Sequence, residues 1–133
     1  EDLPYIISDV LNRRSIHEKI KIKSYYLKHK KNEKPSADVK IEIEGKTYSE
    51  KGTGDGQFDA FMNAVKKIYK KNGYSLPLLT DYSVTIPPGS HSDALCETFI
   101  TWKNSEKEFI TRGLDSDQTV SAIKATEKML NII

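Results

Sequence analysis

The fold is decided by a stretch that the chain contains twice, as GTGDGQFDAFM at residues 52–62 and as GLDSDQTVSAI at residues 113–123. Gly52 aligns with Gly113, and Gln57 aligns with Gln118. The apolar positions of the helices that we expect to follow also match one for one, with Phe61, Met62, Ile68 and Tyr69 over Ala122, Ile123, Met129 and Leu130. Because strand-like runs precede each copy, we predict a duplicated unit of three strands and one helix.

Period-2 alternation of apolar and charged residues predicts the strands of the first unit. Its strands are expected at residues 16–27, around Val39, Ile41 and Ile43, and at 46–51. A turn at 52–56 and a helix at 57–71 follow, and Asn72-Gly73 is a helix stop signal. Residues 3–11, within a linker at 1–15, are expected to form a short helix that belongs to a preceding segment of a longer protein.

The second unit repeats this order. Its strands are expected around Tyr82, Val84 and Ile86, at 94–103 and at 108–112, and its helix from about residue 117 to the end. We therefore predict an α+β fold in which residues 16–73 and 74–133 are two pseudo-repeated βββα units. Their antiparallel sheets carry helices on one face. The uncovered faces or edges favour a homodimer, since twofold symmetry is the commonest.

Composition excludes several classes of protein. The formal net charge of the 133 residues is +2, which does not by itself demand a nucleic acid or an anionic membrane. Cys96 is the only cysteine, so no intramolecular disulfide forms, as is usual in a reducing compartment. No apolar run reaches membrane-spanning length and no signal-peptide pattern is present. These features favour a cytoplasmic location.

The glycine-rich turn before the first helix is the sharpest local signal. Glycines at 52, 54 and 56 allow backbone N–H groups to converge at the positive end of a helix dipole, which attracts anions. The simpler interpretation, a tight turn that uses glycine for positive φ, is favoured on this motif alone. Asp59 complements the dipole structurally, or pairs with a ligand's ammonium group. In the second copy, Asp115 and Gln118 have spacing like that of a capping box.

The remaining candidates have structural interpretations that compete with functional ones. Leu79, Tyr82 and Ile86 are expected in the core, or in an apolar pocket if their strand meets the glycine-rich turn. Cys96 is expected to be a small core residue. None of the three histidines has a second ligand at metal-binding spacing. Paired carboxylates, a metal cluster or an activated nucleophile are not found, so a self-contained enzyme has no support.

An alternative function is binding of double-stranded RNA. A helix, three strands and a helix between residues 3 and 71 have the order of such a domain, and the basic run at 28–31 could contact phosphates. The second βββα unit is unexplained by that fold. A charge run in a loop is usually a solvated face.

Four segments carry a resemblance to a known family: DLPYII at 2–7, GDGQFDA at 54–60, GSHSDA at 89–94 and GLDSDQT at 113–119. Together they resemble the C-terminal regulatory domain of the 2-isopropylmalate synthase and citramalate synthase family, over nearly the whole chain. Gln57 stands where many members have proline, so the turn is expected to be looser here.

The resemblance implies feedback control of an acyltransferase rather than catalysis by this chain. The parent enzymes condense acetyl-CoA with a 2-oxo acid on a separate metal-dependent barrel, so no cofactor is expected in the present chain. The family's paired units form a homodimer that binds leucine, or isoleucine in citramalate synthases. The resemblance places the effector pocket at Gly54, Gly56, Phe58, Asp59, Ala60, Leu79, Asp81, Tyr82 and Ile86, and completes it with Ser92, Cys96, Ser121 and Ile123.

Overall fold

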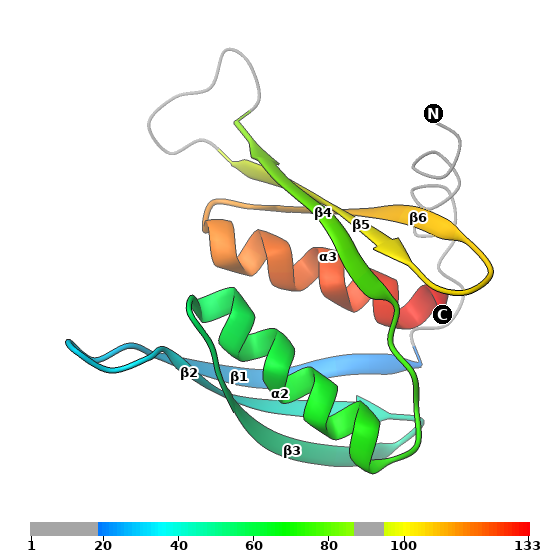
Figure 1. The fold of residues 1–133 in the computed structure, drawn as a ribbon, viewed down its shortest axis with the longest axis horizontal. Coiled ribbons are helices and arrows are strands. Elements are labelled where there is room, and N and C mark those ends of the chain that lie inside the picture. Colours follow the sequence, from blue (N-terminus) through cyan, green and yellow to red (C-terminus); the bar gives the residue numbers. More distant parts are fainter. Residues whose placement is uncertain (1–18, 87–94) are drawn as a thin grey trace. The chain divides into compact units, whose positions relative to one another are not determined.

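The computed structural model describes residues 19–86 and 95–133. It contains two compact units, and the boundary between them in the sequence lies between Leu76 and Pro77. In the first unit, β1 (Ile20–Lys28), β2 (Ser36–Ile43) and β3 (Lys46–Thr53) precede helix α2 (Gln57–Lys71). In the second, β4 (Leu78–Thr85), β5 (Cys96–Lys103) and β6 (Glu108–Asp115) precede helix α3 (Gln118–Ile132) (Figure 1). The predicted α+β fold of two βββα units is confirmed. The helix expected at residues 3–11 lies outside the described residues.

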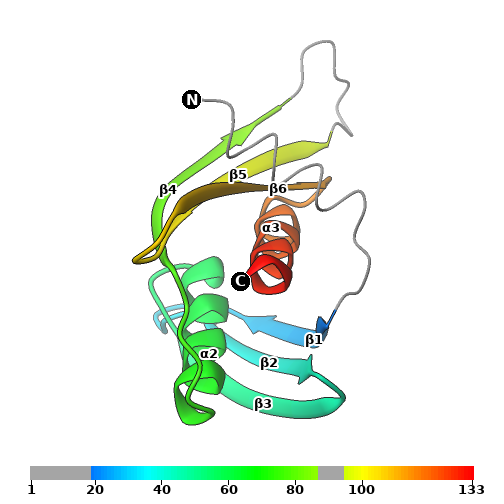
Figure 2. The ribbon, with the colours of Figure 1, turned by 90° about the vertical axis from the view of Figure 1, so that its right-hand side faces the viewer.

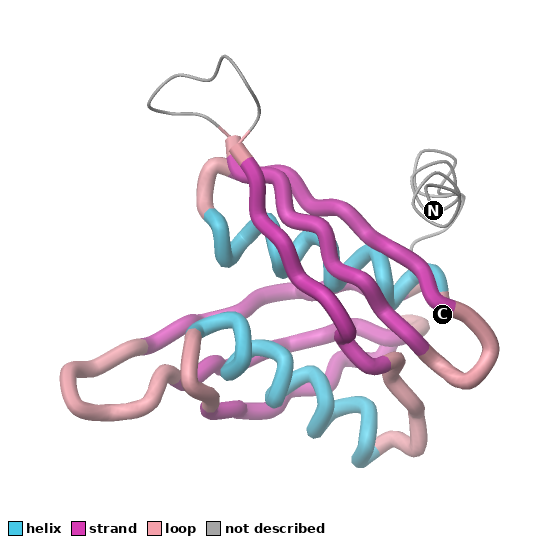
Figure 3. The backbone as a smooth tube through the Cα atoms, turned by 45° about the horizontal axis from the view of Figure 1, so that its top comes forward, coloured by secondary structure: helices cyan, strands magenta, loops and turns pink. Residues whose placement is uncertain are grey.

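Each unit is a two-layer structure. The strand orders are β1-β2-β3 and β4-β5-β6, and every neighbouring pair is antiparallel. One helix covers one face of each sheet (Figures 2 and 3). The central strands β2 and β5 supply the sheet side of each core, because their alternate residues are buried. These residues are Ala37, Val39, Ile41 and Ile43 in β2, and Thr98, Ile100 and Trp102 in β5.

Local sequence signals explain the turn and the helix end of the first unit. Glu44 and Gly45, the two residues between β2 and β3, both have positive φ, 48° and 87°. Such two-residue turns match the right-handed twist of the strands that they connect. After α2, the backbone N–H groups of Gly73 and Tyr74 donate to the carbonyls of Lys70 and Tyr69. Gly73 has positive φ there, so the predicted helix stop is a Schellman motif.

A β-bulge interrupts the first strand of the first unit. Ile22 pairs with Ile41, but the next regular pair is Ser24 with Lys40, so Lys23 is an extra residue. The bulge moves the helix-facing positions of β1 from even to odd numbers, and Tyr25 comes to lie on the same face as Ile22. The Tyr25 ring then meets the Phe61 ring of α2 edge to face, with centroids 6.1 Å apart.

The second unit has a bulge at the matching place. Leu79 pairs with Trp102, and Asp81 pairs with Thr101, so Thr80 is the extra residue. Leu79 and Tyr82 therefore lie on one face of β4, although their numbers differ in parity. Neither bulge was predicted from the sequence. The visible signal was the change of parity in the apolar pattern of each strand.

The glycine that opens each repeated motif lies in a strand rather than in a turn. Strand β3 continues to Thr53 and β6 to Asp115, both beyond their predicted ends. A Cβ atom added to Gly52 would lie within 3 Å of backbone atoms of Ala60 and Ala64, and one added to Gly113 would do so at Ser121 and Ala125. Neither glycine has positive φ. They are needed because the helix backbone passes directly over the third strand.

Gly113→Ala is expected to destabilise the protein by about 3 kcal/mol, because its methyl group would meet immovable helix backbone. Chemical denaturation with urea measures the effect. Gly56→Ala is the matched control. At that position an added Cβ would have its nearest neighbour, Asp59 Oδ2, at 4.0 Å, so the loss should stay within about 1 kcal/mol. Equal stability of Gly113→Ala and the natural chain would contradict this account of the packing.

Tyr69 places a polar group in the core of the first unit. Its side chain is 4% exposed, and its hydroxyl has no hydrogen-bond partner among the described residues. Burial, with a smaller effect of Tyr74, raises the pKa of Tyr69 from 10.0 to about 12. The folded state therefore holds this proton to higher pH than the unfolded chain does. Ionisation of Tyr69 therefore has no effect on the free energy of unfolding below pH 10. Stability is lost as the pH rises from 10 through about 12, because the unfolded chain releases this proton first.

Tyr69→Phe should be as stable as the natural chain at pH 7, or more stable, because it removes a buried polar group without a partner. It should also lose less stability than the natural chain between pH 10 and 12. Urea denaturation at pH 7 and pH 11 measures both effects. A loss of more than about 1 kcal/mol at pH 7 would mean that the hydroxyl makes a stabilising hydrogen bond.

Candidate functional site

The entrance of α2 is the predicted site with the most distinctive backbone. Gly56 is the N-cap residue, with extended φ and ψ of −133° and 173°, and no side chain caps the helix. The first intrahelical hydrogen bond runs from the N–H of Ala60 to the carbonyl of Gly56, at 3.0 Å. The N–H groups of the first helical turn before Ala60 have no acceptor within the helix. They form the positive end of the helix dipole.

Gly54 lets the end of β3 lie directly against this first turn. A Cβ atom added there would be 2.6 Å from Asp59 Cβ and 2.7 Å from Ala60 N. The Gly54 N–H donates to the carbonyl of Pro35 at 3.2 Å, which holds the chain before the helix. Of the glycines in the described residues, only Gly45 and Gly73 have positive φ. The interpretation of the motif as a positive-φ turn is therefore wrong, and Gly52 and Gly54 permit close approach of the backbone to the helix, whereas Gly56 has room for a side chain.

Two side chains at this entrance differ in character. Asp59, in the first turn of α2, is exposed, and its Oδ2 lies beside the N-cap position of Gly56. Phe58 is half-buried and stacks on Phe61, with ring centroids 6.1 Å apart. The structure thus brings together the five predicted residues of the first unit, which are Gly54, Gly56, Phe58, Asp59 and Ala60.

At the start of α3, side chains of the same segment accept hydrogen bonds from backbone N–H groups. The Asp117 carboxylate accepts a hydrogen bond from the Val120 N–H at 3.0 Å. Asp115 accepts from the Asp117 N–H at 2.9 Å and pairs with the Lys124 ammonium at 2.8 Å. The hydrogen bond from Lys124 is the largest of the effects that lower the pKa of Asp115. The predicted Asp115–Gln118 capping box is wrong, because Asp117 is the N-cap residue.

The predicted apolar set of β4 is only partly buried. Leu79 and Tyr82 lie on the helix-facing side of the sheet, opposite Trp102 and Ile100, and Asp81 lies on the other side. Leu79 is 40% exposed and Tyr82 is half-buried. Ile86 follows the end of the strand and is 65% exposed, so its expected place in a regular alternating strand is wrong.

The other predicted residues of the second unit lie in or near its core. Ser121 is fully buried, and its hydroxyl bonds with Thr98 Oγ1 at 2.5 Å and donates to the Gln118 carbonyl at 2.7 Å. Ile123 is 4% exposed. Cys96 begins β5 and is half-exposed, so it is not the buried core residue expected from the sequence. Ser92 lies outside the described residues.

Other kinds of site are not found in the part of the chain that the structure describes. Residues 19–86 and 95–133 contain no group of three or more His, Cys, Asp or Glu side chains that could hold a metal ion. None of their helices is long and apolar enough to cross a membrane.

Comparison with known proteins gives a consistent result. The profile of the LeuA allosteric (dimerisation) domain matches residues 1–133. The chain is 30% identical over 131 residues to 2-isopropylmalate synthase of Methylorubrum populi, and 30% identical over 132 residues to that of Aquifex aeolicus. Each match covers 98% of this chain and 24% of the relative. A protein of Archaeoglobus fulgidus named "Putative (R)-citramalate synthase CimA" is 28% identical over 132 residues, which cover 99% of this chain and 26% of that protein. The chain spans about a quarter of the length of these relatives.

Proposed function

The chain belongs to the family of LeuA allosteric (dimerisation) domains, and on that premise we propose that it binds a branched-chain amino acid as a feedback effector. Leucine is the proposed effector if the parent protein is a 2-isopropylmalate synthase, and isoleucine if it is a citramalate synthase. The parent reaction is condensation of acetyl-CoA with a 2-oxo acid, which we assign to groups outside this chain. Binding of RNA is not proposed, because family membership supports the other function.

The observation that carries this proposal is the uncapped entrance of α2. A free amino acid is a zwitterion, so its site needs donors for the carboxylate and an anion for the ammonium group. The N–H groups that follow Gly56 suit the carboxylate, because no side chain caps the helix there and they lie at the positive end of its dipole. The exposed carboxylate of Asp59, in the same first turn, suits the ammonium group.

The aliphatic side chain of the effector needs an apolar surface. We assign this contact to the partly exposed apolar residues of β4 and its end, Leu79, Tyr82 and Ile86. Asp81, Ser92 and Cys96 complete the proposed set, whereas Ser121 and Ile123 are buried in the core of the second unit and would support the site without contact with the effector. Discrimination between leucine and isoleucine depends on the position of one methyl group and amounts to about 1–3 kcal/mol.

The proposed regulation requires two states with different affinity for the effector. An amino acid that binds one state more tightly shifts the equilibrium toward it, and by linkage the catalytic part changes its affinity for the effector equally. A homodimer is the proposed assembly, with the catalytic part of the longer protein as the second partner. Closed twofold pairs are the commonest arrangement for such proteins.

Isothermal titration of the 133-residue chain with leucine and with isoleucine is expected to give saturable binding of at least one of them. Valine and a D-enantiomer of the better ligand are the controls, because each keeps the charges while it changes the fit. The preferred ligand should bind up to about a hundredfold more tightly than its isomer. The proposal fails if neither amino acid binds at millimolar concentration.

Gly56→Asp is expected to abolish effector binding while it leaves stability equal or raises it by up to about 1 kcal/mol. The extended backbone at position 56 accommodates an aspartate, whose carboxylate would cap α2 and occupy the place of the ligand carboxylate. Asp59→Asn should weaken binding at least about tenfold, since it removes the charge that faces the ammonium group. Titration calorimetry measures binding, and urea denaturation measures stability.

Ser116→Asp is the matched control, because it adds the same charge at the entrance of α3. Its affinity for the effector should be that of the natural chain. Unchanged binding by Gly56→Asp would remove the α2 entrance from the site, even if the chain binds an amino acid elsewhere.

A further inference from the structure

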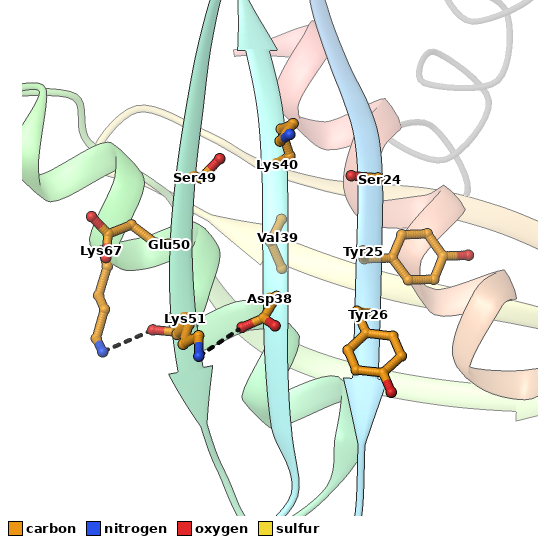
Figure 4. A pocket seen from close by; sticks show the side chains of 10 residues that line it. All are labelled: Ser24, Tyr25, Tyr26, Asp38, Val39, Lys40, Ser49, Glu50, Lys51 and Lys67. Carbon is orange, nitrogen blue, oxygen red and sulfur yellow. Dashed lines mark hydrogen bonds and ion pairs between the residues drawn. The ribbon is translucent and has the colours of Figure 1, made fainter.

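The open face of the first sheet, opposite the face that α2 covers, contains a shallow depression of about 550 Å³. Side chains of all three strands line it, including Ser24, Tyr26, Asp38, Lys40, Ser49 and Lys51 (Figure 4). None of the residues that the sequence analysis assigned to the effector lies among its lining residues.

Strand register arranges these side chains in two rows across the sheet. Lys40 of the central strand pairs with Ser24 of β1 on one side and with Ser49 of β3 on the other. The bulge at Lys23 produces this row, because it turns Ser24 to the open face. In Figure 4 the hydroxyl groups of Ser24 and Ser49 both turn toward the central strand, where Lys40 stands.

The charges around Lys40 are already paired with other residues. Asp38 lies 3.9 Å from the Lys51 ammonium, and Glu42 lies 3.6 Å from the Lys23 ammonium. Lys40 itself forms no ion pair in the described part of the chain, and it is exposed. Lys40 is therefore a cation flanked by two hydroxyl groups, while the carboxylates nearest to it along its strand are paired with other lysines.

The second unit serves as an internal comparison, because it has the same fold. Its corresponding row is Asp81, Thr101 and Ile110, which are joined by the same strand pairing. That row has a carboxylate at one end and an apolar side chain at the other. The fold therefore does not require a serine–lysine–serine row, and only the first unit has it.

We propose that Ser24, Lys40 and Ser49 bind a phosphoryl group, either free phosphate or the phosphate of a small molecule. The ammonium supplies the charge and the two hydroxyl groups supply neutral donors. Opposite residues have Cβ atoms about 5 Å apart, so the two serine Cβ atoms lie about 10 Å apart. Because the Lys40 side chain stands between the two serines, the oxyanion would lie above it rather than on the line that joins them, and would accept hydrogen bonds from the inward-turned hydroxyl groups and from the ammonium.

Tyr26 distinguishes the two sources of the phosphoryl group. It follows Ser24 on the same face, after one intervening residue, and its side chain is 61% exposed. The Lys28 ammonium lies over one face of the ring, 5.4 Å from its centroid, and the rest of the ring lies beside the serine–lysine–serine row, where an aromatic group attached to the phosphate could contact it. A nucleotide would use this ring, whereas inorganic phosphate would not.

The test is an NMR titration of the 133-residue chain with inorganic phosphate, at ionic strength held constant with chloride. Saturable shift changes are expected at residues 24, 40 and 49. Lys40→Gln should weaken binding at least about tenfold, and so should the double variant Ser24→Ala/Ser49→Ala. Lys21→Gln removes one exposed charge from the same open face and should leave the affinity unchanged.

Equal weakening by Lys40→Gln and Lys21→Gln would overturn the proposal, because it would reveal unspecific attraction to a basic surface. Shifts spread over the exposed lysines of α2 would have the same meaning. A parallel titration with adenosine monophosphate identifies the source. Tighter binding than that of phosphate, lost in Tyr26→Ala, indicates a nucleotide, and equal binding that Tyr26→Ala leaves unchanged indicates phosphate alone. Lys40→Gln should keep its affinity for the amino acid, so this proposal and the proposed function fail separately.

Discussion

Close contact between a helix and the third strand of its sheet is the constraint on which each unit depends. Gly52 and Gly113 permit this contact, because any side chain there would overlap helix backbone. The small residues that face them, Ala60 and Ala64 in one helix, and Ser121 and Ala125 in the other, complete it. Since the helix begins only a few residues after the strand ends, the contact also fixes where its first turn lies. The position of the proposed effector site therefore follows from packing in the core.

The two copies have kept this contact and changed what surrounds it. In the second unit the core includes hydroxyl groups that bond with one another, as in Thr98 with Ser121, and the Trp102 indole donates to Thr111 at 2.8 Å. Its helix entrance is closed by Asp115 and Asp117. In the first unit the buried side of the central strand is aliphatic and the helix entrance has no side-chain cap. Each unit can thus keep its fold while only one entrance offers N–H groups to a ligand.

The sequence was sufficient for the order of elements and for most of the core, because period-2 and helical patterns depend on local residue types. Val39, Ile41 and Ile43 are buried as predicted, and the stop at Gly73 is where the motif indicated. The sequence did not indicate why positions 52 and 54 require glycine. The cause is close contact with α2, which lies near these positions only in the folded chain. The N-cap of α3 was misassigned for a related reason. Asp115 and Asp117 both suit a helix start, and only the backbone path decides between them. The assembly of the full effector site stays a prediction, because its residues come from both units.

The first strand of each unit contains a bulge. Its helix-facing residues therefore have even numbers on one side of the bulge and odd numbers on the other. Removal of Lys23 would leave Ile22 next to Ser24, and these two already pair with the consecutive residues Ile41 and Lys40, so β1 would become regular and every side chain would keep its face. A residue inserted elsewhere in the paired segment would instead turn the side chains beyond it to the opposite face. The loop between the first two strands can change length without such an effect, because it lies outside the paired segment. Changes of length should therefore be tolerated beyond Lys28, and so should deletion of the bulge residue at position 23, or at position 80 in the second unit.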